Sequence, residues 1–322
     1  MEKWIAGHVK EAYRAPNHEN WKGRSTTAMQ GAQYWYQNVL LKNWDDGPSA
    51  GSIGIVGYAC EEGVRRNQGR LGAAAGPRVL RERMARLAWH HKDKTITDYG
   101  DVVCVGEDME AAQAQLALMV AGIIETGGMP IILGGGHDLA YGHFRGVRAA
   151  AGDQKLAIIN FDAHFDLRPV TELPNSGTPF NQILKEDLVD YLVLGIQQQA
   201  NTTELFDIAK ENGVEYMLAQ HCRTYQLPTI IQSLDRFLDR NDQVYLSIDL
   251  DGFSSAYAPG VSAPSPLGFS PAFVMAILDY LMASGKIVSV DLAEMNPAYD
   301  VDGHTARLGA GLVDHLLGRL SD

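Results

Sequence analysis

From residue 51 onward, short apolar runs alternate with longer amphipathic stretches. Runs such as IIL at 131–133, LAIINF at 156–161 and YLSIDL at 245–250 are apolar at successive positions, which predicts strands that are buried on both faces. Alternation of such strands with helix-length segments is typical of a parallel sheet with helices on both sides. We therefore predict a doubly wound α/β fold.

The expected elements can be placed along the chain by this pattern. Strands are predicted for residues 52–57, 102–105, 129–133, 155–161, 191–196, 215–218, 243–248 and 286–292. Helices are predicted for residues 109–126, 138–150, 203–212, 227–241 and 271–285.

The first fifty residues differ from the rest of the chain. They are rich in Trp, Asn and Gly and show no clear hydrophobic period, so we expect residues 1–50 to form an irregular arm packed on the domain, with a helix near 28–41. No Pro- or Ser-rich linker divides the remainder, and we expect residues 51–322 to form a single domain.

Composition narrows the functional classes. The chain has 27 Lys and Arg against 39 Asp and Glu, a formal net charge of 27 − 39 = −12, which disfavours binding to nucleic acid. Its three cysteines, Cys60, Cys104 and Cys222, are too few for a disulfide framework. The most apolar stretch, near 116–124, is far shorter than the roughly 18 residues of a membrane span. We expect a cytoplasmic protein that binds no membrane.

Acids and histidines follow four of the predicted strands. The segments are GGGHD at 134–138, DAHFD at 162–166, DLD at 249–251 and AEMNP at 293–297. Binding sites in open parallel sheets form beyond the carboxyl ends of the strands. We therefore expect these side chains to meet at one edge of the sheet.

Their spacing indicates what they bind. Residues at i, i+2 and i+4 of an extended chain point to the same side. Four carboxylates and two imidazoles would then face one pocket, and they are Asp162, Asp166, Asp249, Asp251, His137 and His164. Buried carboxylates need cations, and two divalent ions would balance four negative charges. A ligand set dominated by oxygen favours Mn²⁺ over zinc.

Such a centre indicates hydrolysis. Two cations can hold a water molecule between them and lower its pKa towards neutrality. Glu294, beside them, would repel a phosphate ester and attract a cationic amidinium or guanidinium. The residues therefore point to hydrolysis at the C=N carbon of a small cationic substrate.

Each motif alone has a structural alternative. GGGHD could be a tight turn in which Asp138 caps the next helix, and DAHFD could be a capping cluster. The occurrence of all four at successive strand ends favours the metal site. His143, His221, His304 and His315 lie outside the motifs, and we expect surface or helical positions for them.

The four motifs, together with GVRRNQGRLGAAAGPRVLRE at 63–82, resemble the ureohydrolase family, which includes arginase, agmatinase and formimidoylglutamase. The resemblance implies an arginase-like three-layer α/β/α fold with a mostly parallel sheet of about eight strands, and two Mn²⁺ ions per chain. It also implies that His137 and Asp166 bind one ion, His164 and Asp251 bind the other, and Asp162 and Asp249 bridge them. Asp166 and Glu294 would be the catalytic residues, with Glu294 gripping the amidino group. A homo-oligomer is implied as well.

Within the family, SGTPF at 176–180, DLRP at 166–169 and GIQ at 195–197 resemble the formimidoylglutamase branch. Phe180 stands where arginases carry a histidine. The implied reaction converts N-formimidoyl-L-glutamate and water into L-glutamate and formamide, a late step of histidine breakdown. Candidate partners for the two substrate carboxylates are Arg168, Thr178, Asn67, Arg66 and Arg70.

Three alternatives stay open at this point. The first is an agmatinase, guanidinobutyrase or arginase that releases urea. The second is a scaffold without activity, although a scaffold would not need the six-ligand set. The third is a zinc deacetylase of related fold, which would bind a single ion.

Overall fold

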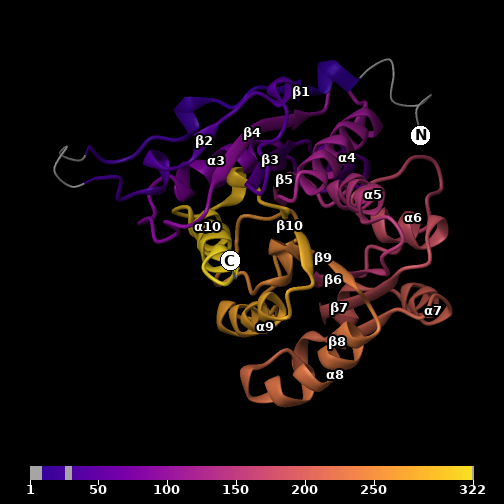
Figure 1. Cartoon of the computed structure of the whole chain (residues 1–322). Helices are drawn as coiled ribbons and strands as arrows, with labels where there is room; N and C mark the ends of the chain where they lie inside the picture. Colours follow the sequence, from indigo (N-terminus) through magenta and orange to yellow (C-terminus); the bar gives the residue numbers. More distant parts are fainter. Residues whose placement is uncertain (1–8, 26–30, 321–322) are drawn as a thin grey trace.

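The computed structural model describes residues 9–25 and 31–320. Within these residues, a central sheet of ten strands has helices on both faces (Figure 1). Among the strands of the described residues, only β1 runs antiparallel to its neighbour, and the other pairings of the sheet are parallel. The predicted three-layer α/β/α fold is confirmed, whereas the predicted count of about eight strands is wrong.

The strands lie in the spatial order β1-β4-β3-β5-β10-β9-β6-β7-β8, and β2 also pairs with β4. Their bounds are β1 Tyr13–Arg14, β2 Leu40–Leu41, β3 Ile53–Ala59, β4 Ile96–Val103, β5 Met129–Gly134, β6 Leu156–Phe161, β7 Asp190–Ile196, β8 Glu215–Leu218, β9 Gln243–Asp249 and β10 Ile287–Ala293.

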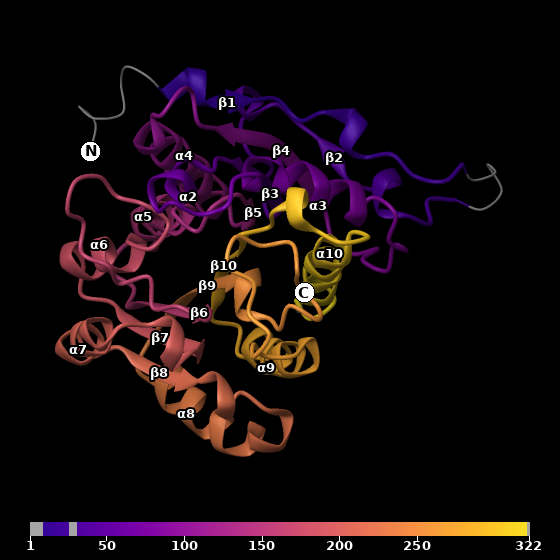
Figure 2. The same ribbon diagram turned by 180° about the vertical axis from the view of Figure 1, so that it is seen from behind.

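The helices are divided between two faces, each with its own hydrophobic core (Figures 1 and 2). One face carries α4 Met109–Glu125, α5 Leu139–Ala151, α6 Pro179–Glu186 and α7 Thr203–Glu211. The other carries α3 Gly76–Met84, α8 Leu227–Asp239, α9 Pro271–Ala283 and α10 His304–Leu317. The short α2 Glu62–Arg66 follows β3. Helices α2, α3, α6 and α10 were not among the predicted helices.

The strand count differs because two strands are too short to show a hydrophobic pattern. Strands β1 and β2 have two residues each and pair with β4 at the edge of the sheet. Strand β4 itself begins six residues before the predicted 102. Its early part contains Asp98, a residue type that is depleted in strands. Asp98 is buried here because Arg81 and the indole N–H of Trp21 donate to its carboxylate, with N···O distances of 2.7–2.8 Å.

The helix predicted near 28–41 is wrong for residues 31–41, and residues 28–30 lie outside the described residues. This segment instead forms a 3₁₀ turn, Trp35–Gln37, followed by β2. Tertiary contacts override helix propensity here. The backbone N–H of Trp35 donates to the Leu87 carbonyl, and its indole N–H donates to Asp314 on α10.

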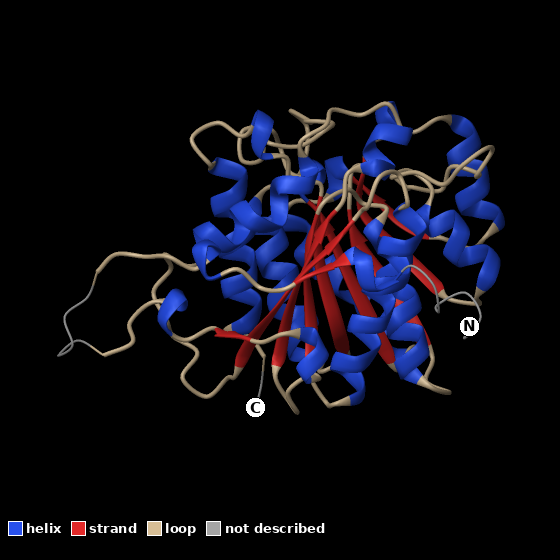
Figure 3. Ribbon diagram, turned by 90° about the horizontal axis from the view of Figure 1, so that it is seen from above, coloured by secondary structure: helices blue, strands red, loops and turns tan. Residues whose placement is uncertain are grey.

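The strands that precede the four motifs are neighbours in the order β5-β10-β9-β6. They run parallel, so their carboxyl ends and the loops that follow lie at one edge of the sheet (Figure 3). The fold thus places the motif loops side by side. None of the described helices combines the length and apolar character needed to cross a bilayer.

Candidate metal centre

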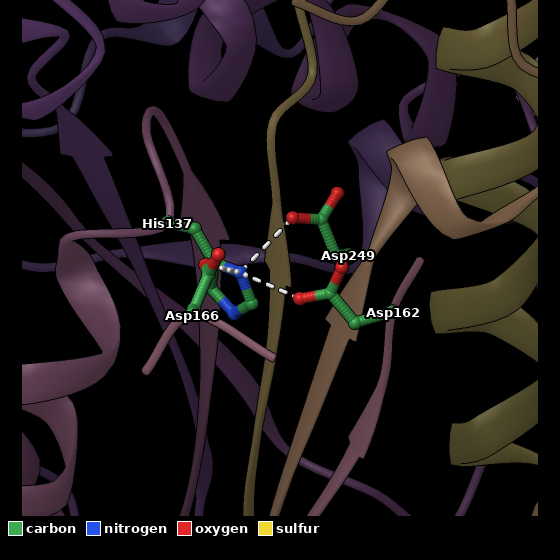
Figure 4. Close-up of side chains that lie close together, drawn as sticks. All are labelled: His137, Asp162, Asp166 and Asp249. Atoms are coloured by element: carbon green, nitrogen blue, oxygen red, sulfur yellow. Dashed lines mark ion pairs between the residues drawn. The ribbon is translucent and has the colours of Figure 1, made fainter. Parts of the chain in front are cut away.

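Acids and imidazoles from separate strand ends converge on one point. His137 Nδ1 lies 2.9 Å from Asp249 Oδ2, 3.1 Å from Asp166 Oδ2 and 3.3 Å from Asp162 Oδ2 (Figure 4). His164 Nδ1 lies 3.3 Å from Asp251 Oδ2 and 3.4 Å from Asp162 Oδ1. The structure therefore brings all six predicted metal ligands together.

The same local turn positions both aspartate motifs. The backbone N–H of His164 donates to Asp162 Oδ1, and that of Asp251 donates to Asp249 Oδ1, each at 2.7 Å. Both bonds join residue i+2 to the side chain of residue i, and they hold each carboxylate at its strand end. In the first motif, Asp166 completes the set with a positive φ of 50°, an uncommon conformation for a residue other than glycine.

Glu294 reaches the centre from β10 in a second left-handed conformation, with φ of 64°. Its backbone N–H donates to the Gly135 carbonyl at 2.8 Å, and its Oε1 accepts from the His137 backbone N–H at 2.9 Å. A Cβ at Gly135 would lie 2.3 Å from the Cys60 carbonyl oxygen, so only glycine fits there. The glycine run thus lets β3, β5 and β10 approach closely enough to place His137 and Glu294 together.

Buried atoms without hydrogen-bond partners support a metal site. His137 Nδ1 and Asp251 Oδ1 are buried and have no hydrogen bond, although carboxylate oxygens surround that nitrogen. The other ring nitrogen, His137 Nε2, lies 2.9 Å from Ser247 Oγ. Ser247 uses its own O–H to donate to Asp291, so it accepts from His137 Nε2–H. That bond leaves a lone pair on Nδ1, which is the form of imidazole that binds a metal.

The charge of the cluster is unbalanced without cations. Burial, together with neighbouring carboxylates, raises the pKa of Asp249 well above its usual range, raises that of Asp166, and raises that of Glu294 to about 8. Burial also opposes ionisation of Asp162, but the imidazoles of His137 and His164 outweigh it and lower that pKa. Such shifts cluster at functional sites, and divalent cations would relieve them.

The ligand atoms form two groups that share one residue. The first contains His137, Asp162, Asp166 and Asp249, and the second contains Asp162, His164 and Asp251. Within each group the ligand atoms lie within 4.8 Å of one another. Carboxylate oxygens dominate both groups, with one imidazole nitrogen in each, which suits a hard divalent cation such as Mn²⁺. The donor set therefore fits a pair of cations with Asp162 between them.

Metal-dependent stabilisation should depend on pH. Burial raises the pKa of Asp251 from 3.8 to about 6, so this group binds a proton on folding and the metal-free protein loses stability as the pH rises between those values. Metal binding requires the ionised carboxylate and releases the proton. We expect the difference in Tm with and without Mn²⁺ to grow from about pH 5 and to level off above about pH 7, where Asp251 is already ionised in the metal-free protein. Thermal unfolding across that range measures it, and a constant difference would contradict the expectation.

A cavity of about 110 Å³ lies over the centre. Besides five of the six predicted metal ligands and Glu294, the cavity is lined by Asn67 and Arg168, two of the predicted substrate-binding residues. Arg168 Nη1 donates to Asn67 Oδ1, and Asn67 Nδ2 donates to Ser176 Oγ at 3.0 Å. Ser176 and Ser262 also line the cavity but were not predicted as site residues, because a serine in a loop carries no distinguishing pattern.

The other three predicted substrate-binding residues are not among the described residues that line this cavity. Arg66 is paired with Glu62 and Glu110, at 2.8 and 2.7 Å. Arg70 donates to the Ser262 carbonyl at 2.9 Å and lies over the Tyr299 ring.

Thr178 is also occupied within its own loop. Its hydroxyl donates to the Asn175 carbonyl at 2.9 Å, next to the start of α6. In the described geometry Arg66, Arg70 and Thr178 therefore hold the loops that surround the cavity.

Of two buried rings near the centre, Phe180 contacts His137 directly, whereas His143 contacts Tyr245 and Asp291. Phe180 is fully buried, meets the His137 ring edge-on at 5.4 Å between centroids and stacks on Tyr191 at 4.5 Å. His143 lies on α5, but it is completely buried rather than at the surface. Its Nδ1 lies 2.7 Å from Asp291 Oδ2. The expectation of a surface or helical position was therefore right about the helix and missed the burial.

Comparisons with known sequences agree with this geometry. The family model described as the arginase family matches residues 51–318. The chain is 45% identical over 298 residues to a formimidoylglutamase of Chromobacterium violaceum, covering 91% of this chain and 95% of that protein. It is 42% identical over 304 residues to a formimidoylglutamase of Geobacillus thermodenitrificans, covering 92% and 94%.

Solved structures show the same fold. The formimidoylglutamase of Bacillus subtilis superimposes with a TM-score of 0.81 at 21% identity, covering 92% of this chain and 94% of that one. The formiminoglutamase of Trypanosoma cruzi with Mn²⁺ gives a TM-score of 0.75 at 25% identity, covering 83% and 92%. The fold, the match of the family model to residues 51–318 and the sequence relatives agree, so this chain belongs to the arginase family of hydrolases.

Proposed function

We propose that the chain hydrolyses N-formimidoyl-L-glutamate to L-glutamate and formamide with two Mn²⁺ ions. The observation that carries the proposal is the convergence of six ligand residues beside the buried carboxylate of Glu294, in a chain whose relatives at 45% and 42% identity are named formimidoylglutamase. The related structure of Trypanosoma cruzi formiminoglutamase, described with Mn²⁺, supports manganese.

His137 and Asp166 would hold one ion and His164 and Asp251 the other, in line with the two groups, and Asp162 and Asp249 would be shared by both ions. Asp162 belongs to both groups, which supports its bridging role. When bound, the two cations neutralise the carboxylates and lower the pKa of a water molecule at the centre towards neutrality, which supplies the nucleophile.

The chain's own residues orient the substrate. Glu294 lines the cavity beside Asp249, and its carboxylate accepts from the N–H groups of a cationic formimidoyl group. The water oxygen bonds to the formimidoyl carbon, and the bond from that carbon to the glutamate nitrogen then breaks. Asp166, which also lines the cavity, accepts one proton of the attacking water and passes it to the departing nitrogen; the remaining hydroxyl proton follows to the same nitrogen as the C=O bond of formamide forms, so glutamate leaves as an ammonium.

Arg168 is the proposed partner of a substrate carboxylate. It is the only arginine or lysine among the described residues that line the cavity, and Asn67 orients its guanidinium. A planar guanidinium binds a carboxylate through two parallel hydrogen bonds. Asn67 and Ser176 complete a polar wall on that side of the cavity.

A substrate panel tests the proposal. The manganese-loaded chain should release formamide from formimidoylglutamate and should turn over agmatine and arginine far more slowly, because agmatine offers no carboxylate to Arg168 and arginine offers one where formimidoylglutamate offers two. Urea release from agmatine or arginine at a higher kcat/KM would assign the chain to the guanidino hydrolases instead. No release of either product after reconstitution would overturn the hydrolase proposal.

Replacing Arg168 should separate recognition from chemistry. Hydrogen bonds to charged groups contribute about 1.5–3 kcal/mol, so we expect Arg168→Ala to lower kcat/KM for formimidoylglutamate by about 10- to 100-fold. The effect should disappear with N-butylformamidine, which lacks carboxylates. Arg223→Ala is the matched control, since Arg223 lines a different cavity. Equal losses for both substrates would contradict the assignment.

Four further predictions belong to this proposal. They are self-association, a cytoplasmic location, a role in histidine breakdown, and the division into an arm of residues 1–50 and a domain of residues 51–322. Light scattering of the purified chain measures the first directly.

A further inference from the structure

A connected set of buried polar side chains lies below the candidate metal centre, between the sheet and α5. It comprises His137, Ser247, Asp291, Tyr245 and His143, and each is completely or almost completely buried. Three of them come from β9 and β10, and His143 comes from α5. Buried polar groups are costly unless they are satisfied, so such a set calls for an explanation.

Asp291 is the centre of the set. Its Oδ1 accepts from the Ser247 hydroxyl at 2.7 Å, and its Oδ2 accepts from the Tyr245 hydroxyl and from His143 Nδ1, the latter at 2.7 Å. A carboxylate can only accept, so each of these three neighbours must direct a hydrogen towards it. Ser247 thereby has no hydrogen left for His137 and can only accept from His137 Nε2.

His143 is fixed in turn from several sides. Its Nε2 meets the Ser289 hydroxyl on β10, and its ring packs against Tyr245 at 4.3 Å between centroids. The ring is fully buried and cannot exchange its partner for water. Removing its N–H would leave Asp291 Oδ2 with one donor, so the carboxylate could turn away from Ser247 and leave the Ser247 hydrogen free to point at His137 Nε2.

We propose that His143 is a positioning residue for the metal centre: by anchoring Asp291 it keeps Ser247 an acceptor, which fixes the His137 tautomer whose Nδ1 can bind a cation. The inference rests on the proposed two-metal function. It assigns to a histidine outside the motifs a part in metal affinity, and His143 makes no contact with the cavity. Direct hydrogen-bond partners of a metal-ligating histidine typically change metal affinity by about 10- to 100-fold, and His143 acts on that scale through Asp291 and Ser247.

The test measures metal binding rather than turnover. Metal-free wild type, His143→Phe and His143→Asn are titrated with Mn²⁺ by calorimetry, and bound metal is counted after dialysis. Phe keeps the ring without the donor, whereas Asn places an N–H close to the Nδ1 position. We expect His143→Phe to bind one of the two ions about 10- to 100-fold more weakly and His143→Asn to stay near wild type.

Two further variants separate positioning from general destabilisation. Phe237→Leu, in the buried face of α8 on the opposite side of the sheet, lowers stability without touching the polar set. If it loses metal as much as His143→Phe does, the effect is global and the inference is overturned. Tyr245→Phe removes the other donor to Asp291 Oδ2 at nearly constant volume and replaces His143→Phe if that variant does not fold.

The outcomes distinguish this inference from the proposed function. If wild type binds two ions and His143→Phe binds them with equal affinity, the positioning role is overturned and the hydrolase proposal stands. The same holds for Tyr245→Phe where it replaces His143→Phe. No manganese binding by wild type would overturn both. Weak binding by His143→Phe, restored in His143→Asn, supports the inference.

Discussion

Asp162→Ala should leave the protein folded, unable to hold two Mn²⁺ ions and almost inactive. Asp162 is the residue shared by both ligand groups, so its loss removes one negative charge and one ligand from each. Turnover should fall about a thousandfold or more, because water without metal activation keeps a pKa of about 15.7 rather than about 7. Metal content after dialysis and the rate of formamide release measure the two effects together.

The control for Asp162→Ala is another buried aspartate. Asp98, in β4, is as buried as Asp162, but it pairs with Arg81 of α3 and belongs to neither ligand group. Asp98→Asn should therefore lower the free energy of unfolding by about 3–5 kcal/mol while the folded protein still binds two ions. Retention of two ions and full turnover in Asp162→Ala would contradict the bridging role.

The residues of the metal centre could be predicted because simple geometry relates them. Carboxyl ends of neighbouring parallel strands meet at one edge of a sheet. The residues beyond each strand end were expected to alternate in an extended chain, and a turn at each strand end brings the same side chains together instead. The carboxylates of DAHFD and DLD are each positioned by the end of a single strand, β6 and β9 respectively. The same logic placed His137 and Glu294, whose strands β5 and β10 are neighbours.

Residues whose partners come from distant segments could not be predicted in this way. Arg168 stands two residues past Asp166 in the sequence, whereas nothing near Arg66 indicates that Glu62 and Glu110 hold it away from the cavity. Ser262 reaches the cavity on a loop that Arg70 fixes through backbone carbonyls, and no periodicity records that contact. His143 looked like an ordinary helical histidine because its partner, Asp291, is almost 150 positions away.

The edge of the sheet was missed for the same reason. Asp98 and Gly100 in β4 resemble a turn in the sequence, and only the contacts of Asp98 with Arg81 and Trp21 make a strand acceptable there. Strands β1 and β2 are too short to show alternation, and pairing with β4 defines them. Local pattern thus predicts the central, apolar strands and fails where polar side chains are buried by long-range pairing.

Glu294→Gln should retain both metal ions and lose most of the activity. Glu294 belongs to neither ligand group, and the substitution keeps an oxygen that can accept from the His137 backbone N–H. What disappears is the negative charge that faces a cationic amidino group. Loss of one partner of a buried, hydrogen-bonded charge pair costs about 2–5 kcal/mol, so kcat/KM should fall between about 30- and several-thousandfold.

This result would separate substrate recognition from metal binding, because Asp162→Ala loses bound metal and activity together, whereas Glu294→Gln keeps the metal and loses activity. Glu61→Gln is the matched control: Glu61 accepts from backbone N–H groups of its own loop and does not line the cavity. Its kcat/KM should stay close to that of wild type. Loss of manganese from Glu294→Gln would show that this carboxylate is a ligand, and an unchanged kcat/KM would show that the amidino group binds elsewhere.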